Sequence, residues 1–421
     1  MPSARSAYLH IPFCHRRCFY CDFAVVPLGD RAGAEPGAPG AASIAAYLKL
    51  LQREIASSPW GPPLHTVYLG GGTPSLLSPG QVKGLLQALD QHFGLAPGAE
   101  ISLELDPASF DQQRLGGYLQ AGINRVSLGG QSFDDQVLAS LGRRHRLVDL
   151  QQAIAWLQQA HRQGDLGSWS LDLIQAVPAP AGQAAAPGRA HWQGQLQQAI
   201  ASGAPHLSVY ELTLEPGTVF AKRAERDQLQ LADDDLATDL FDLTSLTLRA
   251  AGYGRYEISN YALPGHASRH NRVYWGGGDW WGFGLGATSC RGGQRQARPR
   301  TRDAYAAWLA ALPDSETAAV APPGLALDER LLVGLRRREG VAMGAVLTAA
   351  GLEEEQLEAL QQLLAPELEQ GLLLIEGPRW RLSEPAGMGL SNAVLRKLLD
   401  WWEHAAPPPT GSGPPGPGGA D

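Results

Sequence analysis

Three of the four cysteines in this chain lie close together near its start, in the sequence Cys14-His-Arg-Arg-Cys18-Phe-Tyr-Cys21. A disulfide framework would spread its cysteines along the chain, so this grouping indicates a metal or an iron–sulfur cluster in a reducing compartment. A zinc site normally has a fourth Cys or His ligand, for which His15 is the candidate, and ordinary iron–sulfur carriers use four cysteines. Three thiolates suit a [4Fe–4S] cube with one open iron. The spacing therefore predicts such a cluster on Cys14, Cys18 and Cys21.

Residues that could bind a small ligand follow the later apolar segments. Consecutive glycines at 70–72 would let backbone groups approach a ligand closely. Glu104 ends an apolar segment and needs a partner, either an amine or a ribose hydroxyl of a ligand or the nearby Arg125. Gln131 can donate and accept hydrogen bonds, and Arg143 can form a forked pair with a ligand carboxylate. We therefore expect a polar ligand site at these segment ends.

Short apolar or β-branched runs alternate with longer helical patterns along the first 260 residues. This alternation predicts an α/β fold, with a parallel sheet and helices outside it, either open and doubly wound or a barrel. About six such units do not require full closure, and α/β folds place their sites at strand ends. The expected strands are 7–12, 66–70, 100–105, 125–129, 170–174, 206–212 and 255–259, and the expected helices are 43–57, 81–93, 111–121, 147–161, 189–201 and 233–251.

Composition divides the chain into four segments. Residues 1–260 carry the expected partial (β/α) barrel, with a flexible insert rich in Gly, Ala and Pro at about 27–42. Residues 261–320 are expected to close the barrel. Residues 321–405 contain amphipathic helices followed by a hairpin around Gly377-Pro378, which is typical of a small winged-helix-like domain. Residues 406–421 are rich in Pro and Gly and predict a disordered tail.

The overall composition excludes several classes of protein. Of the 421 residues, 44% are hydrophobic and 18% are charged, which excludes global disorder. A net charge of −8 is not the electrostatic footprint of a general nucleic-acid binder. No apolar run reaches the roughly 18 residues that span a membrane, and no secretory segment precedes the first strand. We therefore expect a cytoplasmic protein, in which the isolated Cys290 is a small buried hydrophobe.

The cysteine loop, the Tyr8-Leu-His-Ile-Pro-Phe before it and the later Gly-Gly-Gly-Thr73-Pro resemble the motifs of the radical S-adenosylmethionine superfamily. From Tyr8 to about Trp275 the chain resembles one branch, the oxygen-independent coproporphyrinogen oxidase and HemW group. The resemblance implies a partial (β/α) barrel of that type and a [4Fe–4S] cluster whose open iron chelates S-adenosyl-L-methionine. It also implies that nine residues contact S-adenosylmethionine: Tyr8, Tyr20, Gly71, Gly72, Thr73, Glu104, Gln131, Arg143 and Asp172.

Three features favour the HemW branch over the oxidases. Phe23 stands where the oxidases carry a fourth cysteine, and the chain begins almost at its first strand, without the extension that the oxidases use around substrate. His270-Asn-x-x-Tyr274-Trp275 matches a HemW motif that is linked to heme binding. There an imidazole could ligate heme iron and the aromatic rings could cover the macrocycle. Alternatively, the same segment closes the barrel edge by hydrogen bonding.

The resemblance implies a heme chaperone that carries heme as cargo to an acceptor hemoprotein, with a reductant such as a flavodoxin or ferredoxin. The alternative is an oxygen-independent coproporphyrinogen III dehydrogenase of porphyrin biosynthesis, and a radical enzyme with an unrelated substrate stays open. No catalytic residue is assigned, so enzymatic activity and cleavage of S-adenosylmethionine are left undecided. The chain departs from the branch at Ile174-Gln-Ala-Val-Pro178, where an aromatic-glycine-leucine-proline stretch is usual.

Overall fold

The computed structural model describes residues 4–179, 185–312 and 326–405. The described residues form two compact units, one before residue 313 and one from residue 326 onward. The predicted tail at 406–421 and the predicted boundary at 321 lie outside the described residues. The insert predicted at 27–42 is a loop with turns, which ends where helix α1 (Ala41–Ser57) begins.

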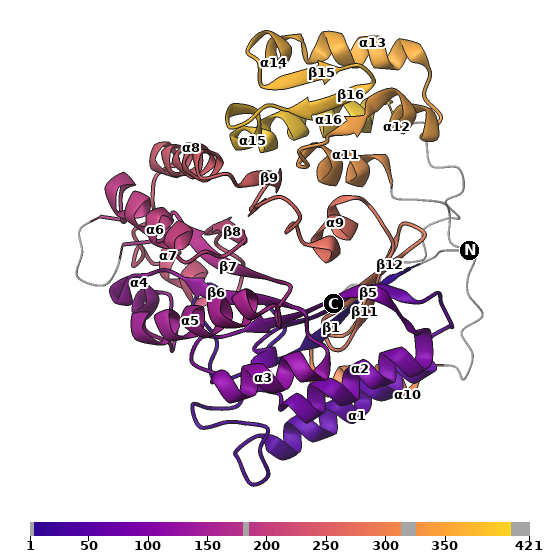
Figure 1. Ribbon diagram of the computed structural model, residues 1–421. Helices are drawn as coiled ribbons and strands as arrows, with labels where there is room; N and C mark the ends of the chain where they lie inside the picture. The colour runs from indigo at the N-terminus through magenta and orange to yellow at the C-terminus, as the bar shows by residue number, and fades with distance from the viewer. Residues whose placement is uncertain (1–3, 180–184, 313–325, 406–421) are drawn as a thin grey trace. The chain divides into compact units, whose positions relative to one another are not determined.

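The first unit is built on a nine-stranded sheet in the order β11-β1-β4-β5-β6-β7-β8-β10-β9 (Figure 1). Six strands run parallel and in chain order, as the alternation in the sequence predicts. The sheet is open, with β11 and β9 at its edges, so the barrel is partial. The six parallel strands are β1 (Ser6–Ile11), β4 (Leu64–Gly71), β5 (Leu95–Leu105), β6 (Arg125–Gln131), β7 (Ser168–Gln175) and β8 (His206–Glu211).

The two edges of the sheet are completed in different ways. β11 (Trp281–Phe283) pairs in parallel with β1. β10 (Asn260–Ala262) pairs antiparallel with both β8 and β9 (Gly254–Glu257). The strand predicted at 255–259 therefore does not continue the parallel order. Only Ile258 and Ser259 join β9 to β10, which suffices for a hairpin but not for a crossover.

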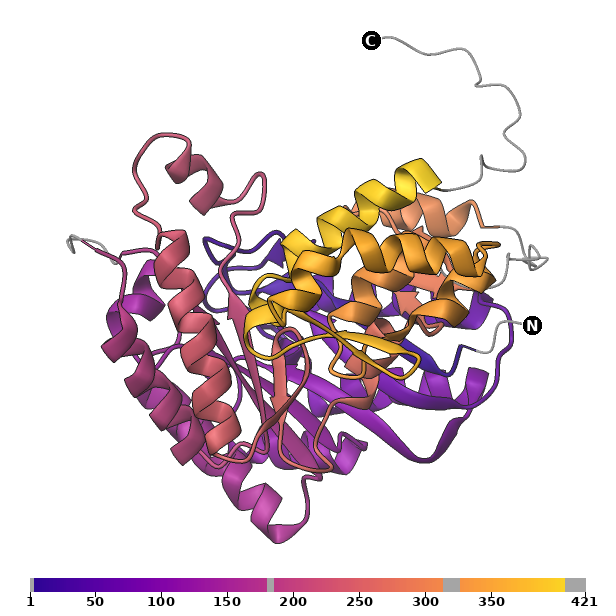
Figure 2. The same ribbon diagram turned by 90° about the horizontal axis from the view of Figure 1, so that it is seen from above.

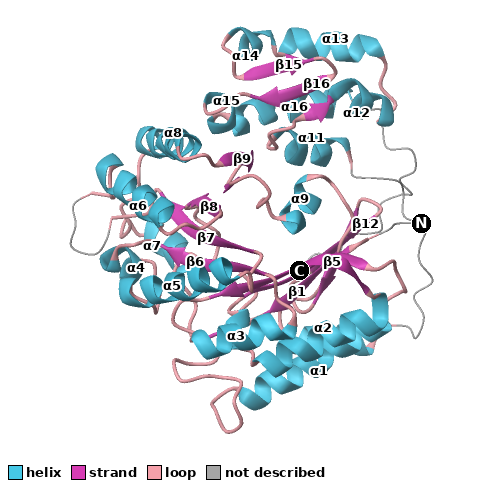
Figure 3. Ribbon diagram, in the orientation of Figure 1, coloured by secondary structure: helices cyan, strands magenta, loops and turns pink. Residues whose placement is uncertain are grey.

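Helices cover the outer face of this twisted sheet, which Figure 2 shows from above and Figure 3 by element type. α1 turns Ile44, Tyr47 and Leu51 inward, the spacing of one helical face. α2 begins with reciprocal hydrogen bonds between Ser78 and Gln81, a capping box. The covering helices are α1, α2 (Pro79–Phe93), α3 (Gln112–Ala121), α5 (Leu147–Gln163), α6 (Arg189–Ala201) and α8 (Asp234–Ala250).

Shorter elements extend the ends of the strands. β2 (Phe13–Cys14) pairs with β3 (Val26–Pro27) at the base of the cysteine loop. α9 (Arg269–Trp275) packs on β4, on the face of the sheet opposite α1 and α2 (Figure 1). The remaining elements are the 3₁₀ helix Pro74–Leu76, α4 (Asp135–Ser140), α7 (Val219–Ala224), β12 (Thr288–Arg291), β13 (Gln294–Ala297) and α10 (Arg302–Ala310).

A buried carboxylate ties the last segment of the first unit to α1. Glu54 accepts hydrogen bonds from Arg298 Nε at 2.8 Å, from the Tyr305 hydroxyl at 2.6 Å and from the backbone N–H of Gly284 at 2.7 Å. Because a buried carboxylate is costly without such partners, this cluster holds the chain that follows β11 in place. Cys290 in β12 is fully buried, as predicted.

The second unit consists of helices and a small antiparallel sheet of order β14-β16-β15, as the winged-helix-like prediction requires. Gly377-Pro378 forms the turn of its hairpin. In the described part of the chain, no helix has the length and apolar character needed to cross a membrane. The elements of this unit are α11 (Leu327–Leu335), β14 (Val341–Ala342), α12 (Met343–Ala349), α13 (Glu354–Leu363), α14 (Ala365–Glu369), β15 (Leu373–Glu376), β16 (Arg379–Leu382), α15 (Ala386–Gly389) and α16 (Ser391–Ala405).

Candidate functional site

A cavity of about 420 Å³ opens where the parallel strands end. This volume is in the range of small-molecule sites in proteins. Tyr8 does not line it, but its ring stacks on that of Tyr68, which does, with 6.2 Å between the ring centroids. The three clustered cysteines line the cavity together with the other eight residues predicted to contact S-adenosylmethionine: Tyr20, Gly71, Gly72, Thr73, Glu104, Gln131, Arg143 and Asp172.

The cysteine loop starts from a paired strand. The N–H of Leu28 donates to the carbonyl of Cys14 at 2.8 Å, next to the short parallel pair of β2 and β3. Cys14 is therefore buried and fixed by backbone pairing. Cys18 and Cys21 lie farther along the loop and are partly exposed. The loop thus presents one sulfur from a strand end and two from its outer part.

His10 fastens the far end of this loop to the first strand. Its Nε2 donates to the carbonyl of Ala24 at 2.9 Å, so its Nδ1 accepts from the Tyr8 hydroxyl at 3.0 Å. Tyr47 on α1 donates to the carbonyl of His10 at 2.7 Å. Burial lowers the pKa of His10, which keeps the ring neutral as this pattern requires. Sequence analysis missed this role, although a histidine within a buried strand was its signal.

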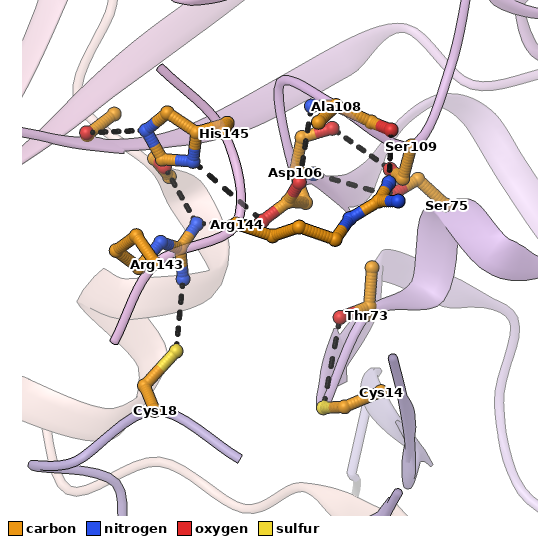
Figure 4. Close-up of polar contacts among 12 residues, drawn as sticks. Cys14, Cys18, Thr73, Ser75, Asp106, Ala108, Ser109, Arg143, Arg144 and His145 are labelled. Atoms are coloured by element: carbon orange, nitrogen blue, oxygen red, sulfur yellow. Dashed lines mark hydrogen bonds and ion pairs between the residues drawn. The ribbon is translucent and has the colours of Figure 1, made fainter. Parts of the chain in front are cut away.

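Two hydrogen-bond donors reach cysteine sulfurs from neighbouring segments (Figure 4). Thr73 Oγ1 lies 3.6 Å from Cys14 Sγ, and Arg143 Nη1 lies 3.6 Å from Cys18 Sγ. Burial raises the pKa of Cys14 to about 12 and also raises that of Cys21. Because metal ligands are thiolates, binding of a cluster here would release protons, and the two donors would stabilise the negative sulfurs.

The three cysteines fit a cluster in which each thiolate binds a different iron. Among the residues that the structure describes, no three His, Cys, Asp or Glu side chains converge closely enough to hold a single ion. A cubane does not require such convergence, because its irons occupy separate corners. Since all three cysteines line the cavity, a ligand in that cavity lies beside them.

An ion pair holds Arg143 next to the cavity (Figure 4). Its Nη2 donates to Asp106 Oδ2 at 2.8 Å and to the carbonyl of Gly129 at 2.9 Å. Burial alone would raise the pKa of Asp106, but Arg143 and His145 hold that pKa below its usual range. The buried Nε of Arg143 has no hydrogen-bond partner in the described part of the chain. Sequence analysis missed Asp106, which the Asp-Pro step after the third expected strand could have marked.

Two carboxylates face the cavity from β5 and β7. Glu104 accepts from the N–H of Gly71 at 3.0 Å, and Asp172 accepts from the Ser127 hydroxyl at 2.8 Å. Burial raises the pKa of both groups, and the charge of Asp172 helps to raise that of Glu104 to about 7. Two acids held this way favour a ligand that brings a cationic group or hydroxyl donors.

At the ends of β6 and β7 the backbone adopts a left-handed conformation that residues other than glycine rarely adopt. Gln131 has φ 64° and Ala176 has φ 55°. Such left-handed residues cost on the order of 1 kcal/mol each and cluster at functional sites. Gln131 lines the cavity, and Ala176 belongs to the stretch Ile174–Pro178 where the sequence departs from its branch. This departure therefore coincides with a strained turn at the cavity edge.

The α9 segment, in which the sequence predicts a heme contact, does not line the cavity. His270 is 1% exposed, with its Nδ1 2.7 Å from Thr66 Oγ1 and its Nε2 2.8 Å from the Tyr274 hydroxyl. Burial lowers the pKa of His270 to about 3, so the ring is neutral. Trp275 is half-buried. Both ring nitrogens of His270 are thus hydrogen bonded within the protein, one to β4 and one within α9.

Glu100 and Tyr68 position this segment, and sequence analysis missed both. The Glu100 carboxylate accepts from the N–H groups of Arg269 at 3.1 Å and His270 at 3.0 Å, where α9 begins. It also lies 3.8 Å from Arg125. Arg125, the alternative partner expected for Glu104, is thus paired elsewhere, and that expectation was wrong. Tyr68 stacks on His270 with 5.3 Å between centroids, so one ring separates α9 from the cavity that Tyr68 lines.

Comparison with known proteins gives concordant matches. The family model described as Radical SAM superfamily matches residues 8–168. The chain is 38% identical to the Heme chaperone HemW of Synechocystis sp., over 95% of this chain and 97% of that protein. It is 36% identical to the Heme chaperone HemW of Mycobacterium tuberculosis, over 93% and 94%. The structure of coproporphyrinogen III oxidase (HemN) from Escherichia coli, at 22% identity, has the same fold, with a TM-score of 0.73 over 94% of this chain and 90% of that one.

Proposed function

Because this chain belongs to the HemW family of radical S-adenosylmethionine proteins, we propose that it is a heme chaperone, which binds heme and transfers it to an acceptor hemoprotein. The observation that carries this proposal is the 38% identity to HemW over 97% of that relative's length. Family membership also implies a [4Fe–4S] cluster and S-adenosylmethionine.

The three cysteines of the loop are the proposed cluster ligands. When bound, the cluster supplies an electron at low potential and an open iron for the amino and carboxylate groups of S-adenosylmethionine. Thr73 and Arg143 orient the sulfurs and stabilise their charge. Glu104 and Asp172 would accept hydrogen bonds from amine or hydroxyl groups of the bound ligand, and their partly buried position would limit competition from water.

We propose that heme contacts α9 through His270, Tyr274 and Trp275. The neutral imidazole is the form that ligates iron, which the low pKa of His270 favours. To reach iron, the ring must give up its hydrogen bond to Thr66 or to Tyr274. Heme binding at this position therefore includes a local opening of α9.

The proposed electron donor is a flavodoxin or a ferredoxin, and the proposed location is the cytoplasm. The donor is the one that the family resemblance implies, and the location follows from the three neighbouring thiols, which persist only in a reducing compartment.

Heme transfer by the reconstituted protein tests the function. After anaerobic reconstitution of the cluster, titration with heme should give a saturable Soret band, and added apomyoglobin should then take up the heme. Wild-type protein that takes up no heme, or that never releases it to an apo-hemoprotein, contradicts the chaperone function.

Coproporphyrinogen III dehydrogenase is the second candidate, favoured by the shared fold with coproporphyrinogen III oxidase. Phe23, in place of the fourth cysteine of the oxidases, disfavours it. Anaerobic incubation with reductant, S-adenosylmethionine and coproporphyrinogen III separates the two functions, because only the dehydrogenase forms protoporphyrinogen.

A further inference from the structure

Four arginines from three parts of the chain meet at the cysteine loop. Two belong to the loop, one lies on α7 and one precedes α10. Three of them are exposed and the one on α7 is half-buried. On a chain with a net charge of −8, such a gathering of positive charge stands out. We call this set the basic collar: Arg16, Arg17, Arg223 and Arg300.

Two collar residues are held on the last part of the loop. Arg17 Nη2 donates to the carbonyl of Phe23 at 3.1 Å, and Arg300 donates to the carbonyl of Asp22. Asp22 is an acid within the loop, yet its backbone carbonyl and not its carboxylate meets Arg300. The guanidinium groups are therefore oriented without being neutralised.

The other two collar residues are oriented in a similar way. Arg16 Nη2 donates to the carbonyl of Arg143 at 3.0 Å, and the guanidinium of Arg223 lies 4.7 Å from the centroid of the Phe19 ring. Among the described residues, no carboxylate forms an ion pair with any member of the collar. The collar thus keeps its positive charge available for another molecule.

An exposed aromatic ring lies within the collar. Phe23 is 52% exposed, and it follows Cys21 by two residues. Its carbonyl is the one that Arg17 binds, so the apolar side chain and the positive charge are adjacent. An exposed apolar side chain beside a cluster of positive charge is typical of a transient protein interface, in which the charges steer the encounter.

We propose that the basic collar and Phe23 dock an acidic electron-transfer protein of the flavodoxin or ferredoxin class, which reduces the cluster. This inference rests on the proposed cluster and is independent of the heme function. The step transfers one electron from the reduced partner to the cluster, so the partner is oxidised by one electron and no atom changes place. A redox partner is favoured over other acidic proteins because the collar residues belong to, or contact, the loop that carries the three cysteines.

Binding to the reconstituted protein tests the collar. The probe is an oxidised acidic [2Fe–2S] ferredoxin, and its affinity is measured by calorimetry at low and high salt. The variant Arg16→Glu/Arg17→Glu should bind about tenfold more weakly or worse at low salt, and the wild-type affinity should fall as salt rises. The matched control is Lys49→Glu/Arg53→Glu on exposed positions of α1, which changes the net charge equally and should bind like the wild type.

A second variant and a second reductant distinguish weaker docking from structural damage to the cysteine loop. Arg300→Glu alters the collar outside the cysteine segment and should also weaken binding. Cluster reduction by the reduced ferredoxin, followed by stopped-flow absorbance, should slow in both variants, whereas reduction by dithionite should not. The proposal is wrong if neither variant binds more weakly than the control. It is equally wrong if the variants lose heme uptake but still bind ferredoxin as tightly as the wild type, since the collar then binds heme propionates.

Discussion

The cavity at the strand ends and the α9 segment both present polar side chains on the inner side of one sheet, but these side chains are partnered differently. In the cavity, Glu104 has a pKa near 7 and the Nε of Arg143 has no partner among the described residues. In α9, both ring nitrogens of His270 are hydrogen bonded to Thr66 and Tyr274.

This difference distinguishes two kinds of binding site. Polar groups that stay incompletely satisfied beside a cavity are already arranged for a ligand, so binding there needs little rearrangement. Groups that satisfy one another must first separate, and the cost of separation reduces the apparent affinity. We therefore expect the cavity to behave as a preformed site and α9 as a site that opens.

The largest expected effect concerns the cysteines that line the cavity. Replacing Cys14, Cys18 and Cys21 together by serine should abolish the cluster, because serine does not supply the thiolate ligands. Iron and sulfide analysis after anaerobic reconstitution measures this loss. Cys290→Ser is the control and should bind iron and sulfide as the wild type does, because that side chain is buried in β12. An unchanged iron content in the triple variant would show that the cysteines lining the cavity do not bind the cluster.

The next effect concerns the ion pair behind the cavity. Asp106→Asn should lower the free energy of unfolding by about 3 kcal/mol near pH 7, because Arg143 is left without its partner. The pKa of Asp106 is depressed in the folded protein, so its stabilisation is present above the unfolded value near 4 and is lost as the pH falls through the lower folded value. Urea unfolding at pH 7 and pH 3 should show the difference between wild type and variant shrinking.

Exposed Asp165 provides the control for this measurement. Asp165→Asn should change the free energy of unfolding by less than about 0.5 kcal/mol at either pH. Equal effects of the two substitutions would mean that the Arg143 pair does not stabilise the unit.

A smaller effect of opposite sign is expected at Glu104. Its pKa of about 7 in the folded protein lies above the ordinary value of 4.5, so stability is lost as the pH rises through this interval. Glu104→Gln removes the charge and should raise the free energy of unfolding by about 1–3 kcal/mol at pH 8, with little change at pH 4. Unfolding curves of both proteins across this range measure it, and parallel pH profiles would contradict a strained carboxylate.

The smallest expected effect tests whether α9 opens. Tyr274→Phe keeps the ring but removes one hydrogen bond that competes for His270, so heme should bind about threefold to tenfold more tightly. Spectroscopic heme titration measures the affinity. In a His270→Ala background the same substitution should have no such effect. Weaker heme binding by Tyr274→Phe alone would show that the hydroxyl contacts heme instead of restraining the imidazole.

Local sequence was sufficient for the order of the parallel strands and for most of the cavity lining. Glycines, cysteines and isolated polar residues at strand ends identify a site because parallel strands bring their ends together. Ion pairs between residues far apart in the sequence could not be predicted in this way. Asp106 meets Arg143 only when the end of β5 and the loop after α4 are adjacent in the folded chain. Arg125 pairs with Glu100 because the register of β5 and β6 brings them together, although they are distant in sequence. The β9–β10 hairpin was missed because a short apolar strand does not reveal its direction.

The pairing of β1 with β11 has a consequence for how this protein is made. The ribosome releases residue 281 long after residue 9, so one edge of β1 stays without its neighbour during most of the synthesis of the unit. Glu54 likewise lacks its hydrogen-bond partners Arg298 and Tyr305 until that later part of the chain has been synthesised. The strand that leads into the cysteine loop is therefore translated well before one of its two neighbours in the sheet. We expect cluster insertion to follow release of the whole unit, and stalled nascent chains to expose a strand edge that chaperones recognise.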